Sequence, residues 1–157
     1  MTWVDDGIFA GGGEHLPESW EDFARQTGIR AVLHLRPGTP AAFRGLPAER
    51  FLWMTVADER EASVPERLLA GAFVETCLRD GYKVLLHSSL GRHRTRWAYV
   101  AYRILGGAEA QAAVRRAERP PWLGPYATDM AAWEAYAVVV GSRRRFGAGH
   151  RWEARSA

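Results

Sequence analysis

The stretch Lys83–Leu105, KVLLHSSLGRHRTRWAYVAYRIL, determines how the rest of the chain is interpreted. Its apolar run Val84–Leu86 is typical of a buried parallel strand, a short polar loop follows, and from about Arg92 apolar residues return at helical spacing. A strand, tight loop and helix in this order direct backbone N–H groups and the positive end of a helix dipole at one point. The sequence therefore predicts an anion site at this loop.

Two residues of the loop make phosphate the expected anion. Gly91 permits a backbone conformation or a close approach that a Cβ would hinder. Arg94 has a planar guanidinium that can clamp two oxygens of a phosphate. We therefore expect phosphate binding by the whole loop, which consists of Ser89, Leu90, Gly91, Arg92, His93 and Arg94.

This stretch resembles the His-Cys-x5-Arg-Ser/Thr motif of the cysteine-dependent tyrosine and dual-specificity phosphatases. The matching residues are His87, Gly91, Arg94 and Thr95. The nucleophile does not match, because Ser88 stands where that family has cysteine, and the single cysteine, Cys77, lies upstream in a predicted helix. The chain thus resembles a phosphatase whose attacking atom has been replaced.

The resemblance implies an α/β fold: one three-layer domain over residues 1–140, with a central, mostly parallel sheet of four to five strands flanked by helices. The order of elements along the chain agrees with it, since strands alternate with helices and the strands are largely apolar. The sequence predicts strand segments around 1–10, 29–35, 51–56 and 84–86, and helices at 17–27, 64–79, from about 92, at 108–119 and at 126–140. Residues 11–13, GGG, are expected to form a loop.

The resemblance also implies a two-step mechanism with assigned residues. A nucleophile at position 88 attacks phosphorus, and an acid protonates the leaving oxygen before water hydrolyses the phosphoenzyme. Asp58 follows a predicted strand at a similar place in the chain and is the expected acid, with Glu59 as the second choice. His87 corresponds to the histidine that orients the cradle, and Thr95 to the hydroxyl that assists the second step.

Serine at position 88 changes the expected outcome. A thiol in such a site has its pKa lowered to about 3.5–7.5 and reacts as a thiolate, whereas a serine hydroxyl is far less acidic. We therefore expect phosphate binding to be retained and turnover to be nearly absent. Two explanations stay open, a deliberate Cys→Ser change that traps substrate and a natural pseudophosphatase; the retention of Asp58 and Thr95 favours the first.

The substrate class also stays open between phosphoproteins and inositol phosphates. The run Gly91–Thr95 resembles the Gly-Lys-His-Arg-Thr of plant and fungal atypical dual-specificity phosphatases that act on inositol pyrophosphates. Arg96, however, departs from the glycine that usually follows the Ser/Thr of the motif. A different enzyme class is a remote alternative, because His87–Gly91 is one residue from the Gly-x-Ser-x-Gly elbow of α/β hydrolases, with Ser89 as nucleophile.

Composition sets the remaining expectations. The chain has 157 residues, 47% hydrophobic, which suits one soluble domain with a substantial core. Residues 141–157 carry a charge of +4 and the rest −1, so the overall +3 belongs to a basic tail that we expect to be flexible. We expect no cofactor, no metal, no nucleic-acid partner and no membrane span, and a cytoplasmic location; a phosphorylated substrate is the expected partner.

Overall fold

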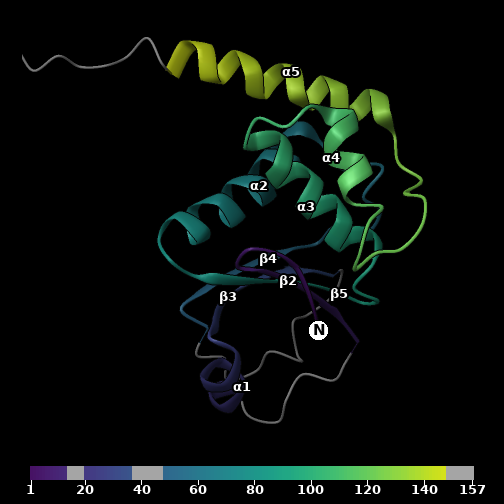
Figure 1. Ribbon diagram of the computed structural model, residues 1–157. Coiled ribbons are helices and arrows are strands. Elements are labelled where there is room, and N and C mark those ends of the chain that lie inside the picture. Colours follow the sequence, from purple (N-terminus) through teal and green to yellow (C-terminus); the bar gives the residue numbers. More distant parts are fainter. Residues whose placement is uncertain (14–19, 37–47, 148–157) are drawn as a thin grey trace, which may run out of the picture.

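A computed structural model describes residues 1–13, 20–36 and 48–147 of the chain, which form a central sheet with helices on both faces (Figure 1). The strands are β1 (Thr2–Asp5), β2 (Ile8–Gly12), β3 (Ile29–Leu35), β4 (Arg50–Met54) and β5 (Lys83–Ser88). The helices are α1 (Trp20–Thr27), α2 (Val64–Arg79), α3 (His93–Leu105), α4 (Ala110–Arg116) and α5 (Met130–Gly147).

The sheet is mostly parallel, as predicted. Its strand order is β1-β2-β5-β3-β4, and β1 pairs antiparallel with β2 while the other neighbours are parallel. The central strand β5 is buried from Val84 to Ser88, since it has strands on both sides and helices on both faces. The buried strand that the apolar run Val84–Leu86 predicts is therefore confirmed.

Two unequal cores hold the three layers together. The smaller lies under α1, where Trp20 packs with Ile29, Val32 and Leu85 from the sheet. The larger lies on the opposite face, where α2 and α3 contact the sheet and α4 and α5 pack on these helices from outside, and it includes the fully buried Trp97 and Trp133 (Figure 1). The predicted three-layer arrangement is confirmed, with most of the helical mass on one side.

Helix α2 begins and ends where the sequence predicts. Ser63 caps its first turn: the Ser63 hydroxyl accepts a hydrogen bond from the Glu66 backbone N–H, and the Glu66 carboxylate accepts one from the Ser63 N–H. Asp80 and Gly81 end the helix, and Gly81 has a positive φ of 86°. This short connection leads directly into β5.

Other boundaries differ from the prediction. The last helix begins at Met130 rather than 126 and continues to Gly147, so the first seven residues of the expected tail are helical. Gly141 alone does not stop it, because Ser142 and the arginines after it tolerate helical geometry. Strand β2 likewise continues into Gly11 and Gly12, which were expected to lie in a loop.

Three predicted segments lie partly outside the described residues: the start of the helix expected at 17–27, the loop that follows Pro37, and the end of the basic tail from 148 onward. Across the described ranges, none of the helices has the length and apolar character that crossing a membrane requires.

Candidate active site

The predicted phosphate loop lies at the carboxyl end of the central strand. Helix α1 connects β2 to β3 across one face of the sheet, and α2 connects β4 to β5 across the other (Figure 1). Strand β5 lies between β2 and β3, so the direction of winding changes beside it. In open α/β sheets ligands bind outside the carboxyl ends of strands at such a point.

The cradle loop, defined here as Ser88–Arg94, is shaped by its own hydrogen bonds. Ser88 is 2% exposed, and its Oγ accepts a hydrogen bond from the Gly91 N–H at 3.0 Å. Gly91 has a φ of +65°, a conformation that residues with a Cβ rarely adopt. The loop thus curls back on the end of β5 before α3 begins at His93.

The glycines at the end of β2 and directly after it contact the backbone of the cradle loop. A Cβ on Gly12 would lie 2.2 Å from the Gly91 nitrogen, and one on Gly91 would lie 2.7 Å from the Gly11 carbonyl carbon. The Gly13 N–H also donates to the Ser89 carbonyl at 2.7 Å. The two backbones therefore touch, and only glycine fits on either side of this contact.

Sequence reasoning treated GGG at 11–13 as an ordinary loop and missed this supporting role. The signal that could have revealed it was three consecutive glycines directly after an apolar strand. Glycine in a strand often marks a close approach of another backbone.

Arg94 is held in place by the ends of two further strands. Its Nη1 donates to the Leu35 carbonyl at 3.0 Å and to the Val56 carbonyl at 3.3 Å, and its Nη2 donates to Ser89 Oγ at 3.2 Å. These contacts join the cradle loop to the end of β3 and to Val56, two residues beyond the end of β4. The guanidinium is therefore positioned at the loop, as a phosphate clamp requires.

Two histidines share a hydrogen bond directly below the cradle loop. His87 Nδ1 lies 3.1 Å from His34 Nδ1, the rings stack with centroids 5.2 Å apart, and the residues are 3% and 1% exposed. The pKa of each is lowered to about 4, mainly by burial; repulsion from His87 contributes to the lowering for His34, whereas a hydrogen bond between the His87 ring and the Gly13 backbone opposes it for His87. Both rings are therefore neutral at pH 7, with one proton between the facing nitrogens.

The His34 partner was not predicted from sequence. Residues 34 and 87 are far apart along the chain, and only the parallel register of β3 and β5 places them opposite each other. The structure thus gives His87 an orienting environment, held by His34 on one side and by Gly13 on the other.

Thr95 lies in the first turn of α3 and is fully buried. Its Oγ1 donates to the Arg92 carbonyl at 2.9 Å, one turn back along the chain. In this arrangement the hydroxyl secures the start of α3. Its assistance to the second chemical step stays a prediction.

Asp58 lies in the loop between β4 and α2, which we call the acid loop, Ala57–Ser63. It begins beside Val56, whose carbonyl accepts the Arg94 hydrogen bond, so the loop adjoins the cradle. Asp58 forms a two-point pair with Arg60, at 3.1 Å from Arg60 Nε to Oδ1 and 2.8 Å from Nη2 to Oδ2. Hydrogen bonds from Arg60 lower the pKa of Asp58 to about 2, so the carboxylate is ionised at neutral pH.

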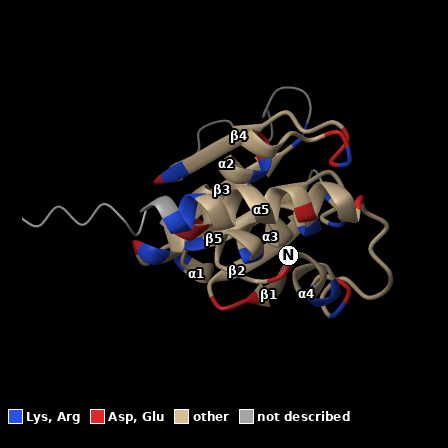
Figure 2. Ribbon diagram, turned by 90° about the horizontal axis from the view of Figure 1, so that it is seen from above, with Lys and Arg blue, Asp and Glu red and all other residues tan. Residues whose placement is uncertain are grey.

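A buried arginine of α2 connects the acid loop to the helical layer. Arg67 is 2% exposed; its Nε donates to the Ala62 carbonyl at 3.3 Å and its Nη2 to the Glu59 carbonyl at 3.5 Å. The guanidinium also stacks over the Trp133 ring, 4.0 Å from its centroid. Arg67 therefore holds the acid loop through backbone carbonyl groups of the loop. In Figure 2 acidic and basic residues follow one another along this loop between β4 and α2.

The remaining predicted loop residues are on the surface. Leu90, Arg92 and His93 are exposed, so their side chains lie where a bound substrate can reach them. Ser89 Oγ accepts from Arg94 rather than facing a histidine, which is unlike the arrangement of a hydrolase elbow. Among the described residues no three His, Cys, Asp or Glu side chains gather as metal ligands would.

The architecture of this chain is similar to that of known protein structures. No sequence-family model and no curated protein sequence matches the chain. Solved structures do: human DUSP28 aligns with a TM-score of 0.72 at 18% identity, covering 91% of this chain and 99% of its own. PTPMT1 in complex with PI(5)P aligns at 0.72 and 14% identity, covering 90% and 96%. The human tyrosine phosphatase-like serine/threonine/tyrosine-interacting protein aligns at 0.68 and 20% identity, covering 92% and 97%.

These neighbours define the fold as that of the dual-specificity phosphatases. The resemblance inferred from the sequence motif is therefore confirmed for the fold. At these identities the likeness establishes the architecture, and the function is argued from the site itself.

Proposed function

We propose that this protein has the active site of a phosphomonoesterase of the tyrosine and dual-specificity phosphatase type, with serine in place of the nucleophilic cysteine. The observation that carries the proposal is the position of Arg94, fixed by the Leu35 and Val56 carbonyls at a loop closed by Gly91. A phosphate in this loop meets backbone N–H groups, the start of α3 and the guanidinium together. None of these contacts requires sulfur.

Ser88 has no strong base to remove its proton. His87 is the neighbouring histidine, but its pKa of about 4 makes the ring a weak base, and its nitrogens are engaged by His34 and Gly13. The Ser88 oxygen also accepts a hydrogen bond from the Gly91 N–H, so one of its lone pairs is not free to attack phosphorus. The chain with Ser88 therefore binds phosphate monoesters and turns them over extremely slowly.

A thiolate at position 88 completes the reaction. Sulfur attacks phosphorus as the ester P–O bond breaks, and Asp58 gives its proton to the leaving oxygen. Water then attacks phosphorus and gives a proton to Asp58, while the P–S bond breaks and the thiolate returns. Asp58 serves as an acid only after it is released from Arg60 and protonated, so substrate binding has to draw Arg60 away.

The exposed polar residues of the cradle loop favour a substrate with more than one phosphate. Arg92 and His93 are exposed and precede Arg94 in the loop, so they can contact additional anionic groups of an inositol phosphate. The neighbour PTPMT1 was solved with PI(5)P, which supports an inositol headgroup as the substrate class. The alternative substrate class is a phosphoprotein, of which a single phosphate would bind in the cradle.

The experiment is to restore sulfur with Ser88→Cys and to measure phosphate release from para-nitrophenyl phosphate. We expect an increase of at least about 10³-fold over the Ser88 chain, because a low-pKa thiolate replaces a neutral hydroxyl. Ser88→Cys combined with Arg94→Ala is the control, and it should be inactive. A folded, phosphate-binding Ser88→Cys protein without activity contradicts the enzyme proposal.

The Ser88 chain itself reports the substrate class. Isothermal titration with an inositol polyphosphate and with a phosphotyrosine peptide compares the two ligands on a protein that consumes neither. Tighter binding of the inositol polyphosphate, lost in Arg92→Gln, supports the inositol class. Tighter binding of the peptide assigns a phosphoprotein.

A second candidate is a natural module that binds phosphorylated ligands without chemistry. The observation that favours it is the fit of Ser88, whose hydroxyl completes the loop's hydrogen bond to Gly91. One structural neighbour is also named phosphatase-like. This candidate predicts phosphate-dependent binding that Arg94→Ala abolishes, with no activity in Ser88→Cys.

A further inference from the structure

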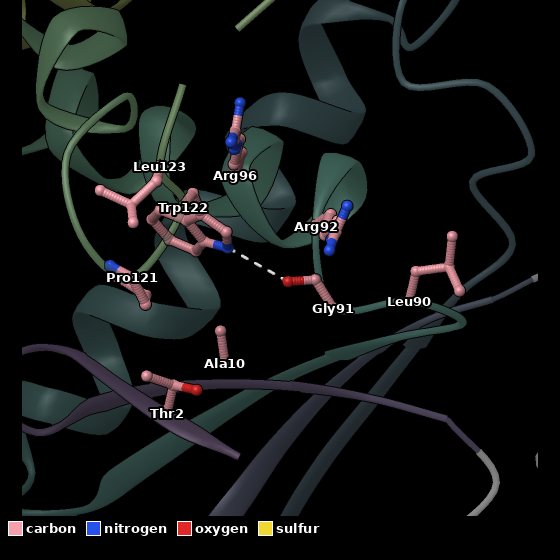
Figure 3. A pocket seen from close by; sticks show the side chains of 9 residues that line it. All are labelled: Thr2, Ala10, Leu90, Gly91, Arg92, Arg96, Pro121, Trp122 and Leu123. Atoms are coloured by element: carbon pink, nitrogen blue, oxygen red, sulfur yellow. Dashed lines mark hydrogen bonds between the residues drawn. The ribbon is translucent and has the colours of Figure 1, made fainter. Parts of the chain in front are cut away.

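A pocket of about 390 Å³ lies beside the cradle loop, between α3, the segment after α4 and the edge of the sheet (Figure 3). Its lining residues are Thr2, Ala10, Leu90, Gly91, Arg92, Arg96, Pro121, Trp122 and Leu123. Neither Arg94 nor Ser88 belongs to this lining. The pocket therefore shares Leu90, Gly91 and Arg92 with the cradle loop and is separate from its clamp.

Two arginines give the pocket a positive charge. Arg92 precedes α3 and Arg96 lies one turn later, so both are on the same side of the helix. Arg92 is exposed, whereas Arg96 is 7% exposed. Burial lowers the pKa of Arg96 and repulsion from Arg92 adds to this, whereas attraction to Tyr126 and Glu118 opposes it.

Within the described part of the chain, neither arginine forms an ion pair. Arg96 donates through Nη1 to the Pro125 carbonyl at 3.1 Å and lies over the Tyr126 ring, while its buried Nε has no hydrogen-bond partner there. The two cations repel each other, and an anion placed beside them relieves that repulsion. This is the first requirement of an anion site.

The other walls are apolar. Trp122 is 4% exposed and forms one side, while Leu123 and Leu90 are 79% and 76% exposed at the rim. In Figure 3 Trp122 and Leu123 lie across the pocket from Leu90, with Arg92 and Arg96 above Ala10 and Thr2. Large exposed leucines at the mouth of a charged pocket indicate a ligand with an apolar part.

We propose that this pocket binds an organic anion, in which a single acidic group sits by Arg92 and Arg96 and a flat or aliphatic body lies against Trp122 and Leu123. The ligand contacts the cradle loop from outside, because Leu90, Gly91 and Arg92 line the pocket; the Trp122 Nε1–H also donates to the Gly91 carbonyl at 3.1 Å. The site does not depend on chemistry at Ser88, so it stands whether or not the chain is an enzyme.

The same hydrogen bond provides a specific readout. The Trp122 indole N–H gives one resonance in a ¹H–¹⁵N spectrum of the full chain, and Trp122→Phe identifies it by its loss. Naphthalene-2-sulfonate is the probe, since it joins one anionic group to a flat apolar body. Methanesulfonate has the same acidic group without the ring and is the matched ligand.

We expect the naphthalene probe to shift the Trp122 resonance, and methanesulfonate to bind at least about tenfold more weakly because it buries little apolar area. Arg92→Gln and Arg96→Gln should each weaken the probe about tenfold through loss of a charge-assisted contact. Arg115→Gln, which removes an exposed arginine of α4, should leave binding unchanged. Because Arg92 is exposed, its variant tests the proposal even if Arg96→Gln fails to fold.

Two further measurements separate this pocket from the cradle. Inorganic phosphate in excess should not displace the probe, and Arg94→Ala should bind it as the unchanged chain does. Displacement by phosphate, or loss of binding in Arg94→Ala, places the probe in the cradle and overturns the proposal. Unchanged affinity in Arg92→Gln together with no shift of the Trp122 resonance also overturns it.

Discussion

The cradle loop and the acid loop meet at the same edge of the sheet, yet they are held in different ways. The cradle loop is fixed by backbone contacts with the glycines of β2 and by an arginine bonded to two strand ends. The acid loop is held by the Arg67 contacts to its carbonyls, and its functional side chain is paired locally with Arg60. The proposed phosphate binding is therefore built into the sheet, whereas the proposed acid catalysis depends on a loop that has to rearrange.

The largest expected effect comes from breaking the cradle at Gly91. Gly91→Ala places a Cβ 2.7 Å from the Gly11 carbonyl carbon and imposes a positive φ on alanine. We expect the free energy of unfolding to fall by about 2–4 kcal/mol and the affinity for inorganic phosphate to fall at least about tenfold. Urea denaturation and a phosphate titration measure the two effects.

Gly81→Ala is the matched control for this change. Gly81 also has a positive φ, of 86°, but a Cβ there meets no atom within 4 Å. It should cost about 1–2 kcal/mol and leave phosphate affinity unchanged. Equal effects of the two substitutions would mean that backbone strain alone, and not the contact with β2, determines the cradle.

An intermediate effect is expected from the histidine pair under the cradle. Both pKa values, about 4 in the folded protein, lie below the usual 6.5, so the unfolded chain binds more protons between these limits. Stability should be full above pH 6.5 and decline as the pH falls toward 4, by about 1–3 kcal/mol between pH 7 and pH 5.

Urea denaturation at pH 7 and pH 5 tests this decline. His34→Asn keeps a neutral hydrogen-bonding group but removes one titrating ring, so the decline should be roughly halved. His93→Asn makes the same substitution at an exposed position and is the control. A pH dependence identical in the His34→Asn and unchanged proteins would contradict the buried, neutral pair.

The smallest effect is expected in the acid loop. In the Ser88→Cys protein, Arg60→Gln removes the pair that holds the pKa of Asp58 at about 2, and that pKa rises toward its usual 3.8. The high-pH limb of the rate profile should move up by about one pH unit or less, with activity at neutral pH increased about tenfold or less. Phosphate affinity should not change.

The pH dependence of kcat/KM with para-nitrophenyl phosphate measures this shift. Arg79→Gln alters a weaker pair, with Asp80 at 3.7 Å, and should leave the profile in place. An unchanged profile in Arg60→Gln removes Asp58 from the role of acid and transfers the assignment to Glu59.

The central part of the fold was predictable from local patterns. The apolar run Val84–Leu86 and the helical spacing after Arg92 determine a strand and a helix, and Gly91 and Arg94 mark the turn and the clamp between them. Helix α2 was predictable because its cap and its stop are encoded within a few residues. The end of α5 was predicted wrongly. The expected helix ended at Val140, before Gly141, but one glycine does not stop this helix, which continues to Gly147.

The sequence by itself determined the chemistry available at position 88 and the turn that we propose to bind phosphate, because these depend on residue type and near neighbours. Tertiary structure alone decided the contact of Gly12 with Gly91, the pairing of His34 with His87 and the pocket beside Trp122. These features join segments distant in the chain, and parallel strand register and helix packing bring them together. Sequence therefore specified which atoms could act, and the sheet decided which of them meet.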